Sequence, residues 1–243
     1  MTFFDYYQSQ ILSQNNFIHA FFTKESSEFK LETLASKFTN NSYSNISIKQ
    51  IHSKNIVYTS QLINKKSIKA DGLIGDLNKQ NLWIYTADCM PILFADKKNK
   101  RIAAIHCGRK GLEKNIIPKL INKLELMGSL RKDILVAIGP CISGNNYLLD
   151  KKTYRRFHKN FKFKNILLSE SFTKNNIKNL YKLIDNEFSN LDIKEYAFFQ
   201  LICENIKPAN IDIFNKCTFD LKNEFHSWRR SKNQSRQWTM ISF

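Results

Sequence analysis

Three residues of metal-binding type stand far apart in the chain, each beside a short apolar run. They are His52 in the segment QIH, Cys89 in TADCMP and His106 in AIHCGRKG. Zinc favours two imidazoles and one thiolate, and a site with three protein ligands keeps its fourth tetrahedral position open, as catalytic zinc sites do. If the three side chains meet in space, we expect an enzyme that activates water or polarises a substrate atom.

The elements that must position these residues are short strands, one ending just before His52, two flanking Cys89 and one ending at His106. The sequence predicts them at residues 46–50, 82–86, 91–95 and 101–106. Several strand ends can converge on one edge of a sheet, but the separations match no helical or hairpin repeat. A buried small hydrophobic role for Cys89 and hydrogen-bonded structural roles for the histidines therefore remain alternatives.

The remaining pattern predicts an α/β fold in one domain. Further strands are expected at 16–23, 134–138 and 211–214, and helices at 28–38, 112–127, after Asp150, around 177–191 and at 195–206. The order is too irregular for a doubly wound sheet, and the Gly-rich phosphate-binding fingerprints are absent. Because no repeat or linker interrupts the chain, we expect residues 1–243 to form a single domain.

The chain is basic, with a formal net charge of +17 at pH 7. Such a charge can indicate nucleic acid, an anionic membrane or a phosphate-bearing substrate. The lysines are scattered, and no nucleic-acid-binding motif accompanies them, so we do not expect a nucleic-acid-binding protein. No apolar run approaches the roughly 18 residues that cross a bilayer, so no membrane partner is expected.

The five cysteines have no CxxC spacing, and the start of the chain lacks the pattern of a secretory signal. We therefore expect a soluble, cytoplasmic protein with free thiols. Its oligomeric state is not specified by the sequence.

The blocks around the three candidate ligands follow a known order. TADCMPILFAD, AAIHCGRKG, AIGPCISGNNYLLD and the tail CTF…FHSWRR…R resemble the purine nucleoside phosphorylase family formerly called multicopper polyphenol oxidases, or laccase-domain proteins. The resemblance runs from about Asn16 to the C-terminus, and the combination of TADC with IGPCI is its most specific part.

This resemblance implies that His52, Cys89 and His106 bind zinc, the same trio that residue chemistry singles out. It implies phosphorolysis of adenosine to adenine and ribose 1-phosphate, and hydrolytic deamination of adenosine to inosine. Inosine, guanosine and methylthioadenosine are the further substrates, so the partners are a purine nucleoside and phosphate. The implied fold is a mixed-sheet sandwich with flanking helices, similar to the cysteine hydrolase fold of the cytotoxic necrotizing factor toxins.

Cationic residues near the blocks are candidates for binding phosphate. Arg109, Lys110, Arg229 and Arg230 are considered, with ordinary solvated charge as the alternative for each. Relatives usually read HAGWRG where this chain reads HCGRKG, so an arginine replaces an indole and a lysine replaces an arginine. Lysine lacks the bidentate fork of arginine, and substrate preference is therefore expected to differ.

Two aspartates near the trio receive different roles. Asp71, before Gly72, is the candidate for orienting a ligand or acting as a base beside the catalytic pair Cys89 and His106. The alternative for Asp71 is a turn residue bonded to its own backbone. Asp88 is expected to point away from Cys89 and to accept structural hydrogen bonds.

Other functions are compatible with parts of the pattern. A metal-free cysteine hydrolase would use Cys89 as nucleophile and His106 as base, but it would not need His52. One copper could replace zinc in a phenol oxidase, although five histidines cannot build a ten-histidine multicopper centre. The non-enzyme alternative is a basic RNA- or partner-binding protein with structural Cys and His residues.

Overall fold

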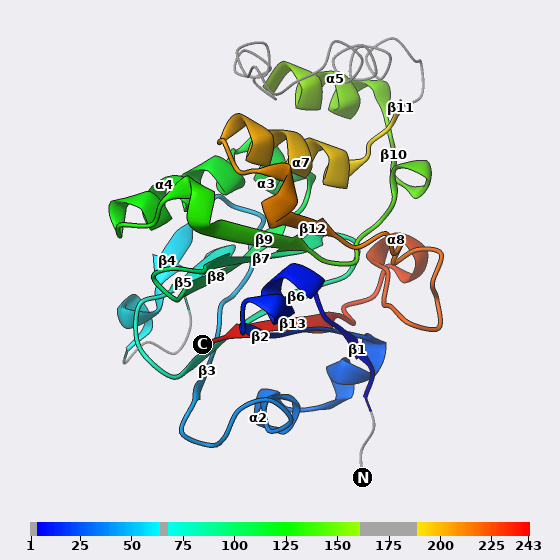
Figure 1. Ribbon diagram of the computed structural model, residues 1–243. Helices are drawn as coiled ribbons and strands as arrows, with labels where there is room; N and C mark the ends of the chain where they lie inside the picture. Colours follow the sequence, from blue (N-terminus) through cyan, green and yellow to red (C-terminus); the bar gives the residue numbers. More distant parts are fainter. Residues whose placement is uncertain (1–3, 64–67, 161–188) are drawn as a thin grey trace.

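Two β-sheets packed face to face form the centre of the molecule (Figure 1). The computed structural model describes residues 4–63, 68–160 and 189–243. The five-stranded sheet has the order β1 (Tyr6–Tyr7), β2 (Ile18–Phe22), β13 (Gln237–Ser242), β6 (Gln80–Thr86) and β3 (Ser44–Ser47). The six-stranded sheet has the order β12 (Ile211–Ile213), β9 (Ile134–Ile138), β7 (Met90–Asp96), β8 (Arg101–Cys107), β5 (Gly72–Gly75) and β4 (Ile56–Tyr58). The short strands β10 (Leu148–Leu149) and β11 (Ser189–Asn190) pair separately.

Both large sheets are mixed, and the strands that carry the candidate site are antiparallel. β7 pairs with β8 and β9, and β8 also pairs with β5, all in antiparallel fashion. Parallel pairs occur at the edges, between β12 and β9, β4 and β5, and β3 and β6. The mixed α/β class expected from the sequence is therefore confirmed.

Alternation of side chains along each strand produces two buried layers from one sheet. In β7, Leu93 and Ala95 face the five-stranded sheet, where they join Leu82 and Ile84 of β6. The intervening Ile92 and Phe94 face the opposite way, toward the helices. Because both faces of β7 are covered, its sequence reads as a continuous apolar run rather than as an alternating one.

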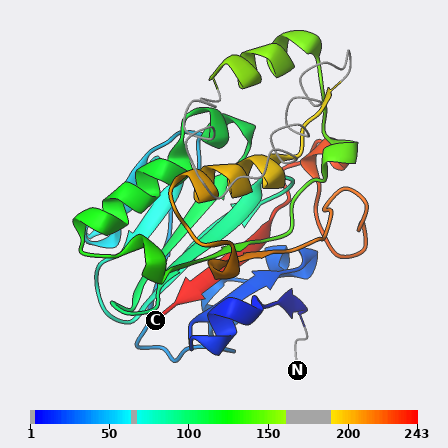
Figure 2. The same cartoon turned by 45° about the horizontal axis from the view of Figure 1, so that its top comes forward.

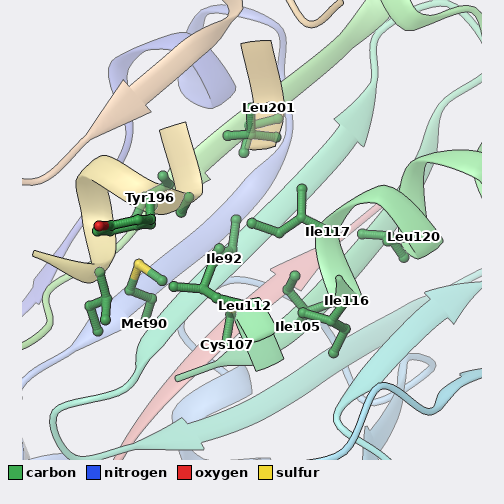
Figure 3. Close-up of a cluster of buried hydrophobic side chains, with 14 of the residues drawn as sticks. Met90, Ile92, Ile105, Cys107, Leu112, Ile116, Ile117, Leu120, Tyr196 and Leu201 are labelled. Carbon is green, nitrogen blue, oxygen red and sulfur yellow. The ribbon is translucent and has the colours of Figure 1, made fainter. Parts of the chain in front are cut away.

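Helices cover the outer face of the six-stranded sheet, where α4 and α7 lie side by side over the strands (Figure 2). Here α3 (Arg109–Glu113), α4 (Ile116–Leu126) and α7 (Ile193–Cys203) pack over the strands, and α5 (Lys151–Asn160) lies beyond them. Figure 3 shows the contact layer: Leu112, Ile116, Ile117, Leu120, Tyr196 and Leu201 of the helices meet Met90, Ile92, Ile105 and Cys107 of the strands.

Shorter helices complete the other side of the molecule. α2 (Leu31–Ala35) places Leu34 and Ala35 against the outer face of the five-stranded sheet, on Phe22 and Trp83. The remaining described α-helices are α1 (Gln10–Gln14) and α8 (Trp228–Ser231). None of the helices in the described parts of the chain has the length and apolar character needed to cross a bilayer.

The structure corrects several expected boundaries. The helix expected at 112–127 is two helices, α3 and α4, because Asn115 between them adopts a left-handed conformation with φ of 56°. The strand expected at 46–50 already ends at Ser47, and the helix expected at 28–38 is limited to α2. The helix expected around 177–191 falls almost wholly outside the described residues. β13 was not predicted.

A matched pair of substitutions in α4 tests the helix–sheet layer. Leu120 is fully buried, whereas Leu126 is 85% exposed in the same helix. We expect Leu120→Ala to lower the free energy of unfolding by about 2–5 kcal/mol because it removes buried apolar contacts and leaves a cavity. Leu126→Ala should change it by less than about 0.5 kcal/mol. Denaturant titration followed by circular dichroism measures both, and equal losses would contradict this packing.

Candidate functional site

His52, Cys89 and His106 converge at one end of the six-stranded sheet. Their potential ligand atoms all lie within 4.8 Å of one another. Cys89 Sγ is 4.0 Å from His52 Nε2, and the two imidazole rings stand edge to face with centroids 4.7 Å apart. His106 is buried, Cys89 is half-buried and His52 is exposed, so the cluster opens to solvent on the His52 side.

The carboxylate of Asp71 positions both histidines. Oδ1 accepts hydrogen bonds from the backbone N–H of His52, at 2.9 Å, and from His106 Nδ1, at 2.8 Å. Oδ2 accepts from the backbone N–H and the hydroxyl of Ser53, and the N–H of Ile51 also points to the carboxylate. His52 has a left-handed backbone with φ of 57°, which turns three successive N–H groups toward the same anion.

Strand register brings Cys89 beside His106. β7 begins at Met90, which pairs with Cys107, and Pro91 pairs with His106, so Cys89 lies where the two strands separate. Gly108 then passes so close that a Cβ built there would lie 2.4 Å from Cys89 Sγ. A glycine is therefore required at this position for the thiol to keep its place.

Asp88 fixes the backbone before Cys89. Its carboxylate accepts hydrogen bonds from Thr218 Oγ1, at 2.7 Å, and from the backbone N–H of Arg229, at 2.6 Å. The expected structural role is confirmed, but the backbone is not extended, because Asp88 has a φ of 83°. The chain leaves β6 at Thr86, and the left-handed conformation of Asp88 then turns it so that Cys89 faces the histidines.

Charge within the cluster favours a carboxylate at Asp71, a thiolate at Cys89 and a protonated ring at His106. Burial of Asp71 would raise its pKa, but hydrogen bonds from His106 and Ser53 outweigh burial and lower the pKa to about 2. Burial likewise opposes ionisation of Cys89, yet the nearby His106 lowers the pKa of the thiol below its ordinary value. The thiolate and Asp71 in turn raise the pKa of His106 against the effect of burial.

The donor set fits a metal ion of zinc type. An ionised Asp71 can only accept, so His106 donates from Nδ1, and Nε2 is the ring nitrogen that a metal would take by displacing its proton. A carboxylate bound to the second nitrogen of a ligating histidine is the usual support of such sites. Two imidazoles and a thiolate with lowered pKa match the ligand preference of zinc. Among the described residues, this trio is the group of candidate ligands that meets these conditions.

A cavity of about 1180 Å3 opens above the trio. The metal-ligand candidates lie among its lining residues, together with four aromatic side chains: Tyr85, Tyr147, Trp228 and Trp238. Tyr85 and Trp238 stand edge to face with centroids 5.2 Å apart. Gln50 ties this wall to the loop that carries His52, since its amide exchanges two hydrogen bonds with the backbone of Tyr85.

The cavity is cationic. Arg109, Lys110, Arg229 and Arg236 line it, whereas Asp88 is the sole acid among the described lining residues, and its oxygens are already hydrogen-bonded. Arg109 forms an ion pair with Glu113 one turn along α3. The guanidinium of Arg229 lies 5.0 Å from the centre of the Tyr147 ring. These charges favour an anionic ligand near the trio.

The structure does not bring every candidate to the cavity. Arg230 lies outside the residues that line it, and its guanidinium donates to the carbonyls of Thr218, Phe219 and Phe225. Sequence reasoning gave no role to Arg236, and it favoured a surface or core role for Trp228 over a place in the pocket, yet both residues line the cavity. Both lie in a polar tail with no local periodicity that would have indicated their position.

Comparisons with known proteins agree with this architecture. The family model described as multi-copper polyphenol oxidoreductase laccase matches residues 23–243. A purine nucleoside phosphorylase of Borreliella burgdorferi is 30% identical over 247 aligned positions, covering 97% of this chain and 95% of that protein. A purine nucleoside phosphorylase of Synechocystis sp. is 32% identical over 177 positions, covering 71% of this chain and 67% of that protein.

Solved structures share the fold at lower identity. A hypothetical protein of Bacillus licheniformis is 20% identical and has a TM-score of 0.75, covering 96% of this chain and 94% of its own. A Neisseria meningitidis protein at 19% identity has a TM-score of 0.71, with 94% of both chains covered. The two-sheet arrangement therefore occurs in proteins of much diverged sequence.

Replacing Asp71 tests its hold on the histidines. In Asp71→Asn an NH2 group, which can only donate, replaces one of the two carboxylate oxygens that accept hydrogen bonds. We therefore expect the affinity for added zinc to fall by about 10- to 100-fold. Competition with a chromophoric chelator measures the affinity. Asp76→Asn is the matched control, because Asp76 also accepts from a turn, at Thr59 and Ser60, but away from the trio. Unchanged affinity in the Asp71 variant would contradict the assignment.

Gly108→Ala tests the close approach to Cys89. The added methyl group would overlap Sγ, so we expect the protein to fold but to retain much less added zinc than the wild type. Metal content measured after dialysis gives the result. Gly128→Ala serves as the control, because a Cβ there meets nothing within 4 Å even though its φ of 91° makes the substitution mildly destabilising. Full zinc content in Gly108→Ala would refute the steric requirement.

Proposed function

Because the chain belongs to the family described as multi-copper polyphenol oxidoreductase laccase, we propose that it is a zinc-dependent purine nucleoside phosphorylase. The observation that carries the proposal is the His52–Cys89–His106 cluster at the base of a cationic, aromatic-lined cavity. The names of the Borreliella and Synechocystis relatives support the same reaction class.

The reaction exchanges one bond for another at the sugar. A phosphate oxygen forms a bond to C1′ of the ribose, the bond from C1′ to the purine N9 breaks, and its electron pair leaves with the base, which takes a proton. In the transition state negative charge develops on the departing base and positive charge on the ribose, which lies next to the anionic phosphate. Fixed dipoles and cations that meet this charge contribute most to the rate.

The trio and its supports have distinct tasks in this proposal. His52, Cys89 and His106 would hold the metal, which supplies Lewis-acid polarisation of a substrate atom or of water when bound. Asp71 keeps the two imidazoles oriented through its hydrogen bonds to His106 Nδ1 and the His52 N–H. It is a positioning residue, because its carboxylate is buried beneath the histidines and its oxygens are occupied.

Lys110 and Arg229 are the best-placed phosphate partners. Lys110 follows Gly108 and Arg109 directly, at the start of α3, and its side chain is exposed on the cavity. Neither Lys110 nor Arg229 forms an ion pair within the described parts of the chain. Arg109 is less free, since Glu113 holds its guanidinium.

Aromatic side chains supply a surface for the purine. Trp228 is 45% exposed and lines the cavity, as do Trp238 and Tyr85, which contact each other. A base that stacks on such rings gains about 1–3 kcal/mol without strict selection among purines. This supports a set of purine substrates, with adenosine, inosine, guanosine and methylthioadenosine as the proposed members.

Deamination of adenosine is the second proposed reaction of the same site. Attack of an activated water at C6 of the purine would release ammonia and give inosine. The HxE…PCxxC motif typical of zinc nucleobase deaminases is absent from the sequence, so the trio would perform this chemistry on a different scaffold.

A metal-free thiol mechanism is the competing candidate. The pKa values of Cys89 and His106 shift toward a thiolate–imidazolium pair, which is the resting state of a cysteine nucleophile. The exposed His52, placed 4.0 Å from Sγ, has no task in such a dyad. A copper-dependent phenol oxidase could use the same three ligands, but the soft and borderline donor set does not require a redox metal.

The decisive assay follows adenosine with and without phosphate. We expect adenine to appear only when phosphate is present, and inosine to appear slowly in both cases. Cys89→Ala and metal chelation should each lower kcat/KM for phosphorolysis by more than about 100-fold, because the Lewis acid is lost. Cys203→Ala, which alters a half-buried thiol at the end of α7, is the matched control and should keep full activity.

The same assay separates the alternatives. Activity that survives chelation but not Cys89→Ala would establish the thiol nucleophile. Activity that survives both treatments would refute any role of the trio in the reaction.

A further inference from the structure

Four cationic side chains line the cavity, and Arg236 has no task in the proposed reaction. Lys110 and Arg229 lie beside Cys89, because Lys110 follows the Gly108 that approaches Sγ, and the backbone N–H of Arg229 donates to the neighbouring Asp88. Arg236 comes from a different element, directly before β13, and lines the cavity with Ser27, Ser235 and Trp238. Phosphorolysis consumes one phosphate, which the wall beside Cys89 can bind.

Arg236 belongs to a corner where positive charge accumulates without a counter-charge. Burial of His226 lowers its pKa, and the positive charges of Lys24, Arg230 and Arg236 lower it further. His226 Nε2 is 3.1 Å from the hydroxyl of Ser27, which lines the cavity. Neither Lys24 nor Arg236 has a carboxylate partner among the residues that the structure describes. Grouped cations of this kind favour a bound anion.

The side chain of Arg236 is held in place with one edge free. Nη1 donates to the carbonyls of Asn233, at 3.0 Å, and of Ser235, at 2.7 Å. No hydrogen bond from Nε or Nη2 to a described residue is found, and the side chain is half-buried. The edge formed by Nε and Nη2 is the face with which arginine binds two oxygens of one phosphoryl group.

The cavity also has more room than a nucleoside and a phosphate require. Its volume of about 1180 Å3 exceeds the roughly 300–1000 Å3 of ordinary small-molecule pockets. A second anion-binding place in the same cavity fits a substrate that carries a phosphoryl group of its own.

We propose that the cavity takes purine nucleoside 5′-monophosphates, with Arg236 binding the 5′-phosphoryl group while the wall beside Cys89 binds the attacking phosphate. This inference rests on the proposed function and names its substrate class. The bond changes are those given above, so phosphorolysis of the monophosphate yields the free base and ribose 1,5-bisphosphate. The 5′-phosphoryl group stays on the sugar throughout.

Binding without turnover tests the inference. Inosine and inosine 5′-monophosphate are titrated into the purified, metal-containing protein by calorimetry in phosphate-free buffer. Inosine has no 6-amino group, so deamination cannot interfere. We expect the monophosphate to bind at least about tenfold more tightly than inosine, a difference equivalent to about 1.4 kcal/mol.

Two variants assign that difference to a residue. Arg236→Gln should reduce the preference for the monophosphate over inosine by at least tenfold. Lys222→Gln, which removes an exposed charge outside the cavity lining, should preserve the preference and so controls for net charge. Equal affinity of the wild type for both ligands, or a preference that survives Arg236→Gln, would overturn the proposal.

A third titration separates the two possible sources of the phosphoryl group. Inorganic phosphate alone should bind wild type and Arg236→Gln with affinities within twofold, because it belongs to the wall beside Cys89. An equal loss for inorganic phosphate and for the monophosphate would assign Arg236 to free phosphate and refute the inference. Absence of base release from inosine with phosphate would refute the proposed function instead, and the binding preference would remain a separate result.

Discussion

The hydrogen-bonded carboxylate of Asp71 is the interaction on which the rest of the site depends. It is buried beneath two imidazoles and accepts from the loop at residues 51–53 and from His106. Burying such a charge is costly unless it is fully hydrogen-bonded, and charge-assisted bonds are the strong ones. One anion thereby fixes a loop residue and a strand residue that are distant in sequence, and the cluster has its shape before any ligand arrives.

The two sheets supply the rigidity that this arrangement needs. His106 belongs to β8 and Cys89 immediately precedes the adjacent antiparallel strand β7, while Asp71 immediately precedes β5, which pairs with the other edge of β8. The backbone N–H of His106 donates to the carbonyl of Asp71. The strand pairing that aligns β5 with β8 therefore also aligns Asp71 with His106 in the site. A slip of one residue would turn His106 to the opposite face. The packed layers on both sides of β8 make such a slip prohibitive.

The strands around the site were predictable because they are short apolar runs with clear ends. The expected strand at 134–138 coincides with β9, which Gly139 and Pro140 terminate. The break at Asn115 was not predictable, because the apolar spacing continues through it and a single left-handed residue leaves no trace in the pattern. β13 was missed because its stability comes from pairing with β2 and β6, far away in sequence.

The cavity lining shows a similar limit. Arg229 and Arg230 are neighbours in sequence and equally basic, yet α8 turns successive side chains by about 100°. One therefore reaches the cavity, whereas the other donates to three backbone carbonyls. No property of the residues themselves separates the two roles. The ligand trio, by contrast, was singled out from residue type and from its place beside strand ends, and the resemblance of the surrounding blocks to a known family was needed to favour a metal site over structural roles.

Arg109 shows how the cavity compensates for its departure from the usual family pattern. An arginine replaces the indole expected there, but Glu113 pairs with it and Tyr147 contacts it, so it braces the wall rather than meeting a ligand freely. Aromatic surface is available instead from Trp228 and from Trp238. The replacement affects neither the candidate ligands nor Asp71, which are held by separate bonds. It therefore changes the wall of the cavity, while the arrangement of the trio is preserved.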